Sequence, residues 1–374
     1  MKVEFYKHNI GQQEIAAITK TLKSLFLTTG EVTSEFEQQF AKYLSCQQVI
    51  GVTSCTAALH LSLFTLGIGN GDEVITTPLS FYATANAILY TGAKPVFVDV
   101  ETDTGLIDPR LIEKAINKKT KAILPVHLYG QMCDMKRIHG LAKKYNLKIV
   151  EDAALCIEGK RDNFKPAQLS DAACFSFHAI KSITSGEGGA IATNNQTLAE
   201  KLKFTRLHGM GKTVIERHQN KDKKQDMLML GFKCNMFDIQ AALLLNQLKN
   251  INKLLRLRTS HYDKYTKAFS KNLKINLPVI KPSSQSAKTL FTLWVDPKKR
   301  DEYVLGLQEM GIGVTIKYSP IHLSTYYKKI FGYKKGDFPI AEKISRSTIT
   351  LPLYPKLKNS EMEYIVKCVN CIIK

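Results

Sequence analysis

The stretch "QQVIGVTSCTAALHLSLFTLGIGNGDEVITTP" (47–78) contains the pattern that decides the fold. It consists of an apolar run rich in β-branched residues, a helical segment and a second apolar run, separated by small and polar residues. The same alternation continues through the apolar runs at residues 94–100, 121–128, 147–153 and 173–179. Nearly continuous apolar strands that alternate with helices are typical of α/β proteins. We therefore predict a mostly parallel sheet between layers of helices.

The last third of the chain has a different pattern. A long helical stretch from 236 to 269 precedes two β-like runs, "AKTLFTLWVD" (287–296) and "GIGVTIKY" (311–318). These segments predict a smaller C-terminal α+β domain. We place the boundary near residue 250, which gives a large domain at 1–250, including the N-terminal segment, and a small domain at 251–374. A chain of 374 residues is long enough for two such domains around a large buried core.

Composition favours a soluble cytoplasmic protein. The hydrophobic content of 44% and the charged content of 23% are ordinary for a globular chain. The N-terminus lacks the basic and apolar pattern of a secretory signal, and no apolar run approaches the ~20 residues of a membrane-spanning helix. Among the eight cysteines only Cys368 and Cys371 form a C-x-x-C pair. Because a structural metal site needs three or four ligands, we expect no metal.

The formal net charge of +20 is compatible with a nucleic acid, a membrane surface or a small anionic substrate. The densest basic run, "KTVIERHQNKDKK" (212–224), contains acidic residues and no aromatic residue that could stack on a base. No recognised nucleic-acid-binding motif accompanies the charge. We therefore expect no nucleic-acid partner, and a phosphate-bearing substrate would account for only a few of these charges.

The stretch "FSFHAIKSITSGEGGAI" (175–191) has a single lysine, Lys181, in nearly uncharged surroundings before a glycine-rich turn. Apolar surroundings lower the pKa of a lysine, which makes its neutral amine available as a nucleophile. The alternative is a surface lysine between two strands. Asp152 lies near the end of the run at 147–153, just beyond its buried apolar residues, at the strand end where open α/β sheets bind ligands. An amine and a carboxylate of this kind are what pyridoxal phosphate requires, although Asp152 could also be a helix N-cap.

Three further segments could complete a site for pyridoxal phosphate. In "TSCTAAL" (53–59) a strand leads into a helix, so the backbone N–H groups at the helix start would point at an anion; they belong to Cys55, Thr56 and Ala57. The hydroxyl of Ser176 could add a bond to a phosphate. Phe81 could stack on a ring, or else belong to the core. Each segment alone is weak evidence, and their joint occurrence at strand ends is what favours the cofactor.

With these motifs the chain resembles the DegT/DnrJ/EryC1/StrS family of nucleotide-sugar aminotransferases, which are fold-type I enzymes that use pyridoxal phosphate. This resemblance implies that the large domain has a mostly parallel, seven-stranded sheet between helices. The resemblance covers roughly residues 5 to 355. It rests on long motifs in the same order, namely "LTTGEVTSEFEQQFAKYL" (27–44), "GDEVITTPLSFYATANAILYTGAKPVFVDVE" (71–101), "LPVHLYGQMCDM" (124–135), "VEDAAL" (150–155), "FSFHAIKSITSGEGGAI" (175–191), "RLHGM" (206–210), "GFKCNMFDIQAALLLNQL" (231–248) and "YKKGDFPIAEKISRSTITLPLYP" (333–355).

The resemblance implies a role for each of these positions. Lys181 would be the Schiff-base lysine and proton shuttle, and Asp152 the partner of the pyridine nitrogen. The remaining cofactor contacts would come from Phe81 at the ring, from Cys55, Thr56, Ala57 and Ser176 at the phosphate, and from Asn235, which would reach the phosphate across a homodimer interface. Two positions depart from the family. Leu155 replaces a common Gln or His near the ring oxygen, and Cys55 replaces a common glycine.

The motif "SFHAIK-x-IT" is similar to the corresponding motif in the branch of the family that acts on UDP-linked 4-keto sugars. That likeness implies transfer from L-glutamate, through pyridoxamine phosphate, to the C4 ketone of a 4-keto-6-deoxy sugar or a 4-keto pentose. By the same likeness the substrate pocket would contain Tyr6, Leu25, Phe26, Leu27, Thr28, Lys317 and Tyr318. His322 could also contact substrate, or be a surface histidine.

Two other functions stay open at this point. One is amination of a 3-keto nucleotide sugar, since no motif identifies the sugar or the base. The other is a cofactor-binding regulator without catalysis, which the presence of both Lys181 and Asp152 disfavours. A branch of the family that dehydrates sugars has histidine at the position of Lys181, so the lysine favours transamination.

Overall fold

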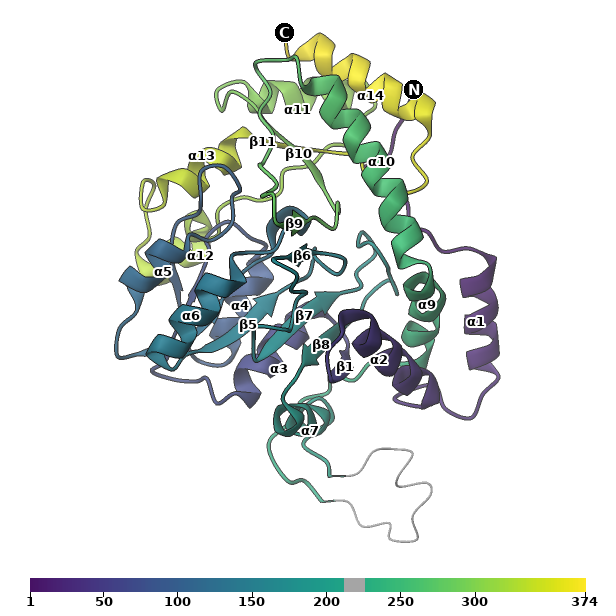
Figure 1. The fold of residues 1–374 in the computed structure, drawn as a ribbon, viewed down its shortest axis with the longest axis vertical. Helices are drawn as coiled ribbons and strands as arrows, with labels where there is room; N and C mark the ends of the chain where they lie inside the picture. The colour runs from purple at the N-terminus through teal and green to yellow at the C-terminus, as the bar shows by residue number, and fades with distance from the viewer. Residues whose placement is uncertain (212–225) are drawn as a thin grey trace.

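The computed structural model describes residues 1–211 and 226–374, and the basic run at 212–224 lies outside them. At its centre is a seven-stranded sheet with the strand order β1-β8-β7-β5-β4-β2-β3. Figure 1 shows β1, β8, β7 and β5 of this sheet near the middle of the molecule. Its strands are β1 (Gln48–Val52), β2 (Glu73–Thr76), β3 (Lys94–Phe97), β4 (Thr120–Leu124), β5 (Lys148–Asp152), β7 (Ala172–Ser176) and β8 (Gly189–Thr193). This sheet confirms the predicted α/β architecture.

All but one of these strands are parallel. The strand β8 pairs antiparallel with both β1 and β7, whereas the pairs β7–β5, β5–β4, β4–β2 and β2–β3 are parallel. The strands β1 and β2, which begin and end the stretch at 47–78, are consecutive in the chain but not neighbours in the sheet. Four strands lie between them, so the connection through α3 (Cys55–Thr65) crosses over these strands.

Both faces of the sheet are buried, which explains why its strands contain apolar residues at consecutive positions. Ile123 of β4 packs in one apolar core together with Phe36 and Phe40, whereas its neighbours Ala122 and Leu124 pack in a second core on the other face. Successive side chains of a strand point to opposite faces, so two cores require apolar residues at consecutive positions. The helices around this sheet are α1 (Gln12–Leu22), α2 (Glu31–Leu44), α3 (Cys55–Thr65), α4 (Tyr82–Tyr90), α5 (Pro109–Ala115), α6 (Met135–Tyr145), α7 (Gln196–Thr205) and α9 (Asp238–Lys249).

The C-terminal part has its own apolar core, formed around Phe291 and Tyr265. Its helices are α10 (Ile251–Phe269), α11 (Arg300–Glu309), α12 (Thr325–Phe331), α13 (Pro339–Ser347) and α14 (Asn359–Ile372), and its strands are β10 (Phe291–Trp294) and β11 (Thr348–Leu351). A short pair, β6 (Lys160–Arg161) with β9 (Ser284–Gln285), joins this part to the large one. Among residues 1–211 and 226–374, no helix is both long and apolar enough to cross a membrane.

Three details differ from the sequence-based picture of the C-terminal part. The helical stretch predicted at 236–269 is two helices, α9 and α10, which meet at Asn250. The run at 311–318 forms isolated bridges and no regular strand. Val3 pairs with Ile312 and is buried in the C-terminal core, so the first residues of the chain pack away from the large sheet. A domain boundary near residue 250 stays a prediction, and it would fall at the junction of α9 and α10.

Candidate active site

A cavity of about 430 Å3 lies at the carboxyl ends of the parallel strands. Residues that end or directly follow β1, β2, β4, β5 and β7 line it, and its size is typical of sites for small molecules. Its lining includes eight of the predicted residues, namely Cys55, Thr56, Phe81, Asp152, Ser176, Lys181, Lys317 and Tyr318. A larger, more open groove of about 1080 Å3 beside Trp294 contains none of the predicted site residues. The chemistry therefore points to the smaller cavity.

Lys181 lies in the loop that follows β7, and its side chain lines the cavity. Burial lowers the pKa of its amine, the negative charge of Asp152 opposes this effect, and the positive charge of Lys317 adds to it. The hydroxyl of Tyr6 donates a hydrogen bond of 2.6 Å to the backbone carbonyl of Lys181. The surroundings of Lys181 thus favour a neutral amine. Its backbone is held by Tyr6, which belongs to the N-terminal segment.

Asp152 is the last residue of β5 and is almost fully buried at the cavity. Its Oδ2 accepts a hydrogen bond of 2.7 Å from Thr84 Oγ1, and its Oδ1 accepts one of 3.2 Å from the N–H of Ala154. Thr84 is itself bonded to Ser80 Oγ at 2.7 Å. These bonds fix the direction of the carboxylate. Sequence reasoning did not identify Thr84, because a threonine in the first turns of a helix has no distinctive pattern.

The N-terminus of α3 supplies backbone donors at the cavity. Ser54 caps this helix, since its Oγ accepts a hydrogen bond of 3.1 Å from the N–H of Ala57. Of the three predicted amides, Ala57 is therefore already occupied within the cap, and those of Cys55 and Thr56 are left for an anion. Gly189 of β8 passes so close that a Cβ there would lie 2.4 Å from the carbonyl carbon of Ser54.

Two predicted side chains border this helix start. Phe81 is the N-cap of α4 and lines the cavity, and the residue is 58% exposed, so its ring can stack on a flat ligand. Ser176 ends β7, and its Oγ accepts a hydrogen bond of 3.3 Å from the N–H of His178. A hydroxyl that accepts one bond still has a proton to donate, so Ser176 can bind an anion.

The C-terminal part contributes Lys317 and Tyr318 to the cavity. Tyr129 donates a hydrogen bond of 3.0 Å to the backbone carbonyl of Lys317, which holds this segment against the large sheet. Burial lowers the pKa of Lys317 and raises the pKa of Tyr318 above its usual range. The cavity therefore combines a second amine with an aromatic hydroxyl that stays protonated.

His127 also lines the cavity and was not predicted as a site residue. Its Nδ1 accepts a hydrogen bond of 3.2 Å from the N–H of Cys133, so its Nε2 carries the proton and donates to Glu151 Oε2 at 2.6 Å. With both ring nitrogens occupied, His127 offers a ligand only its ring face. Leu155 adds an apolar side chain to the same cavity, in line with the departure seen in the sequence.

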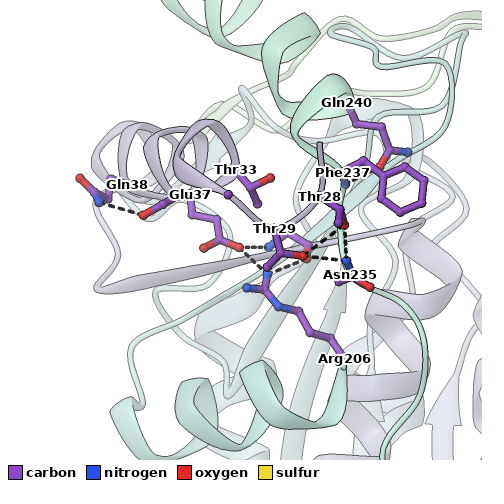
Figure 2. Close-up of polar contacts among 12 residues, drawn as sticks. Thr28, Thr29, Thr33, Glu37, Gln38, Arg206, Asn235, Phe237 and Gln240 are labelled. Atoms are coloured by element: carbon purple, nitrogen blue, oxygen red, sulfur yellow. Dashed lines mark hydrogen bonds and ion pairs between the residues drawn. The ribbon is translucent and has the colours of Figure 1, made fainter. Parts of the chain in front are cut away.

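Asn235 and the segment at 25–28 do not line the cavity of their own chain. Asn235 Nδ2 donates hydrogen bonds of 2.8 Å to Thr28 Oγ1 and of 2.7 Å to Thr29 Oγ1 (Figure 2). These bonds join the loop that carries Asn235 to the segment at 25–28, so the two form one unit. Leu25 is 76% exposed, and Leu27 and Phe26 belong to the same segment. Arg206 secures the neighbouring strand, because its Nη1 donates to Glu37 Oε1 and, at 2.8 Å, to the carbonyl of Gly51.

His322 is placed outside the cavity as well. It is fully buried, its ring lies 4.7 Å from that of Phe338, and its Nε2 is 3.2 Å from Glu342 Oε1. The alternative of a surface histidine is therefore wrong, and the structure gives no support to a contact with substrate. Within the described residues, no group of three His, Cys, Asp or Glu side chains could hold a metal ion.

Comparison with known proteins places this geometry in a family. The chain is 39% identical to the spore coat polysaccharide biosynthesis protein SpsC of Bacillus subtilis over 371 residues, which are 98% of this chain and 95% of SpsC. Spr1654 of Streptococcus pneumoniae, assigned as a sugar aminotransferase and solved in its PMP form, superposes with a TM-score of 0.93, 30% identity and 99% coverage of both chains. The same protein has also been solved in its PLP form.

A second solved structure is PseC of Helicobacter pylori, an aminotransferase involved in the biosynthesis of pseudoaminic acid. It superposes with a TM-score of 0.93 at 29% identity, covering 100% of this chain and 99% of PseC. The model of the DegT/DnrJ/EryC1/StrS aminotransferase family matches residues 8–370. With a buried lysine amine and a fixed carboxylate in one cavity, the protein is a pyridoxal-phosphate-dependent aminotransferase, and its chain belongs to the DegT/DnrJ/EryC1/StrS family.

Proposed function

We propose that the protein transfers an amino group from L-glutamate to the C4 ketone of a nucleotide-linked 4-keto sugar. The substrate would be a 4-keto-6-deoxy sugar or a 4-keto pentose linked to UDP, in the biosynthesis of amino sugars or surface glycans. The observation that carries the proposal is the cavity that contains both Lys181 and Asp152 beside the N-terminus of α3. The names of SpsC and PseC support a sugar substrate.

The residues of the cavity fit pyridoxal phosphate. Asp152, directed by Thr84 and Ala154, would face the ring nitrogen, and the exposed ring of Phe81 would cover one face of the cofactor. The phosphate would lie against the amides of Cys55 and Thr56 and the hydroxyl of Ser176. The bound cofactor supplies an electron sink that allows an amino group and a proton to move between two substrates.

Lys181 would hold the cofactor and afterwards move the proton. A general base must be neutral at the working pH, and burial lowers the pKa of this amine in the required direction. Leu155 adds a buried apolar wall to the cavity that contains Lys181 and Asp152. These residues support transamination in general, and the preference for C4 over C3 rests on the motif around Lys181.

Lys317 and Tyr318 would bind the nucleotide-sugar. The positive charge of an ammonium group at this position is favoured when a diphosphate lies beside it, because an opposite charge offsets the effect of burial on the pKa of Lys317. The protonated hydroxyl of Tyr318 can donate a hydrogen bond to a sugar or phosphate oxygen. Tyr6, which is bonded to the Lys181 carbonyl, would border the same pocket.

The unit of Asn235 and residues 25–28 supports a homodimer with shared active sites. Leu25, Leu27 and Phe237 are exposed apolar side chains of this unit, which a second copy would cover. Within the described residues, Asn235 Oδ1 is buried without a hydrogen-bond partner. Threonine hydroxyls can donate as well as accept, so turning the amide keeps both threonine bonds and frees Nδ2 for the phosphate in the partner's cavity.

The test has two parts. Lys181→Ala is expected to lose both turnover and the visible absorbance of lysine-bound cofactor, whereas Lys298→Ala, a change at an exposed lysine, should keep both. An active Lys181→Ala enzyme would refute the mechanism. Product NMR on UDP-, dTDP- and GDP-linked 3-keto and 4-keto sugars then identifies the carbon. If the protein binds the cofactor but added glutamate does not remove the visible absorbance of the bound cofactor, the protein would be a regulator instead.

A further inference from the structure

The loop from Ser182 to Glu187, which connects Lys181 to β8, has no regular secondary structure. Buried backbone groups outside helices and sheets need side-chain partners. Gln247 of α9 supplies two of them, because its Oε1 accepts a hydrogen bond of 3.0 Å from the N–H of Thr184 and its Nε2 donates one of 2.7 Å to the carbonyl of Thr184. Gln247 is only 3% exposed, so water cannot replace these bonds.

A second glutamine of the same helix holds the far end of this loop. Gln240 Nε2 donates a hydrogen bond of 2.8 Å to the carbonyl of Glu187, which lines the cavity. Gln240 and Gln247 are seven residues apart on α9, so they lie on one face, two turns from each other. We call these two residues the α9 glutamine pair. Together they hold the loop between Thr184 and Glu187 against one rigid helix.

The beginning of the loop is held as well. Ser182 Oγ donates a hydrogen bond of 3.2 Å to Glu158 Oε2, and Glu158 is paired with Arg258 of α10. Lys181 itself receives the hydrogen bond from Tyr6 at its carbonyl. Each anchor comes from a segment distant in sequence, and α9 and α10 follow each other directly along the chain (Figure 1). The backbone that carries the Lys181 side chain is therefore fixed from outside the sheet.

We infer that Gln247 is a positioning residue for Lys181, and that the α9 glutamine pair fixes the loop from which the lysine amine reaches into the cavity. This inference rests on the proposed role of Lys181. The side chain of lysine is long and flexible, so the position of its amine depends on a fixed backbone. A displacement of about 1 Å in a reacting group can cost up to ~100-fold in rate.

The test compares Gln247→Met with a matched control, Gln131→Met. Gln131 is also buried and also holds a loop by two backbone bonds, from its Nε2 to the Val279 carbonyl at 2.9 Å and from the Lys281 N–H to its Oε1 at 2.7 Å. It does not line the cavity. Two readouts are measured, namely hydrogen exchange of the peptide at 177–188 in cofactor-free protein, and the rate at which added pyridoxal phosphate attaches to Lys181.

For Gln247→Met we expect faster exchange in this peptide and attachment slowed by about 10- to 100-fold. Gln131→Met should leave both readouts unchanged. If Gln247→Met does not fold, Gln240→Ala tests the same inference at the less buried member of the pair. Unchanged exchange and attachment, or equal slowing in the control, would overturn the inference. A wild-type protein that does not attach the cofactor at Lys181 would instead overturn the proposed function, and the exchange readout would still stand.

Discussion

Glu158 and Arg258 form an ion pair whose strength can be tested by a single isosteric change, Glu158→Gln. The pair joins the loop after β5 to α10, and the side chains of Glu158 and Arg258 are 0% and 2% exposed. Arg258 Nε donates to the carbonyl of Lys288 and its Nη2 donates to that of Ala287, both at 3.2 Å. The variant keeps the shape of the side chain and removes only its charge.

The expected cost follows from this burial. Without the carboxylate, the guanidinium of Arg258 keeps two carbonyl acceptors but loses the only negative group that is bonded to it in the described residues. Removing one partner of a fully buried ion pair costs about 3–5 kcal/mol, because the other charge stays desolvated. Proteins are usually stable by only about 5–15 kcal/mol, so we expect a large decrease in the free energy of unfolding.

The assay is urea unfolding at a fixed protein concentration, since association contributes to the stability of an oligomer. Far-UV circular dichroism follows the whole chain, and the fluorescence of Trp294, the single tryptophan, follows the end of β10 where it packs against the core of the large part. The control is Asp301→Asn, which breaks the pair with Arg300 Nε at 2.7 Å where Asp301 is 82% exposed. Exposed pairs contribute little, so this control should unfold like the wild type.

A double variant provides the decisive comparison. Glu158→Leu combined with Arg258→Met removes both charges, and an apolar pair of similar size is often as stable as the ion pair it replaces. We therefore expect the double variant to recover most of the stability that Glu158→Gln loses. The reasoning is refuted if Glu158→Gln behaves like Asp301→Asn, or if the double variant is no more stable than the single one.

Two further predictions concern the cavity. The rate at which Lys181 reacts with an amine reagent should rise with pH around a midpoint below 10.5, and Lys317→Met should move that midpoint to higher pH, because the charge of Lys317 lowers the pKa of Lys181. An unchanged midpoint in a pH titration of this rate would contradict that assignment. Gly189→Ala should cost about 1–3 kcal/mol by overpacking and weaken cofactor binding, because its Cβ would lie 2.4 Å from Ser54. Gly140→Ala, where a Cβ meets nothing within 4 Å, should instead stabilise α6 by about 0.5–1 kcal/mol, and equal effects in thermal unfolding would argue against the steric reason.

Much of the fold followed from short-range patterns. The six apolar runs predicted six of the seven strands, all except β8, because both faces of the sheet are buried and consecutive positions of a strand are then apolar. Chain breaks were harder to predict. The helical pattern runs through Asn250 without Gly or Pro, so nothing in the local sequence marked the junction of α9 and α10. Val3 gave no sign that it would pair with Ile312, more than 300 residues away.

The sequence by itself determined the residues that sit at the strand ends. Lys181, Asp152 and Cys55 each follow an apolar run, and parallel strands bring their carboxyl ends to one edge, so their gathering in one cavity follows from local order and a general rule. The motif around Lys181 added the chemistry of the family. Neither step required knowledge of how distant helices pack.

Only the tertiary structure decided the contacts that hold these residues in place. The bond of Thr84 to Asp152 joins residues 68 apart, and the bonds of Gln247 to Thr184 join residues 63 apart. The structure also places His322 in a buried pair and Asn235 outside the cavity of its own chain. Such contacts depend on which side chains meet when separate elements pack, and no periodic pattern of the sequence records this, because the pattern specifies only which face of each element is apolar.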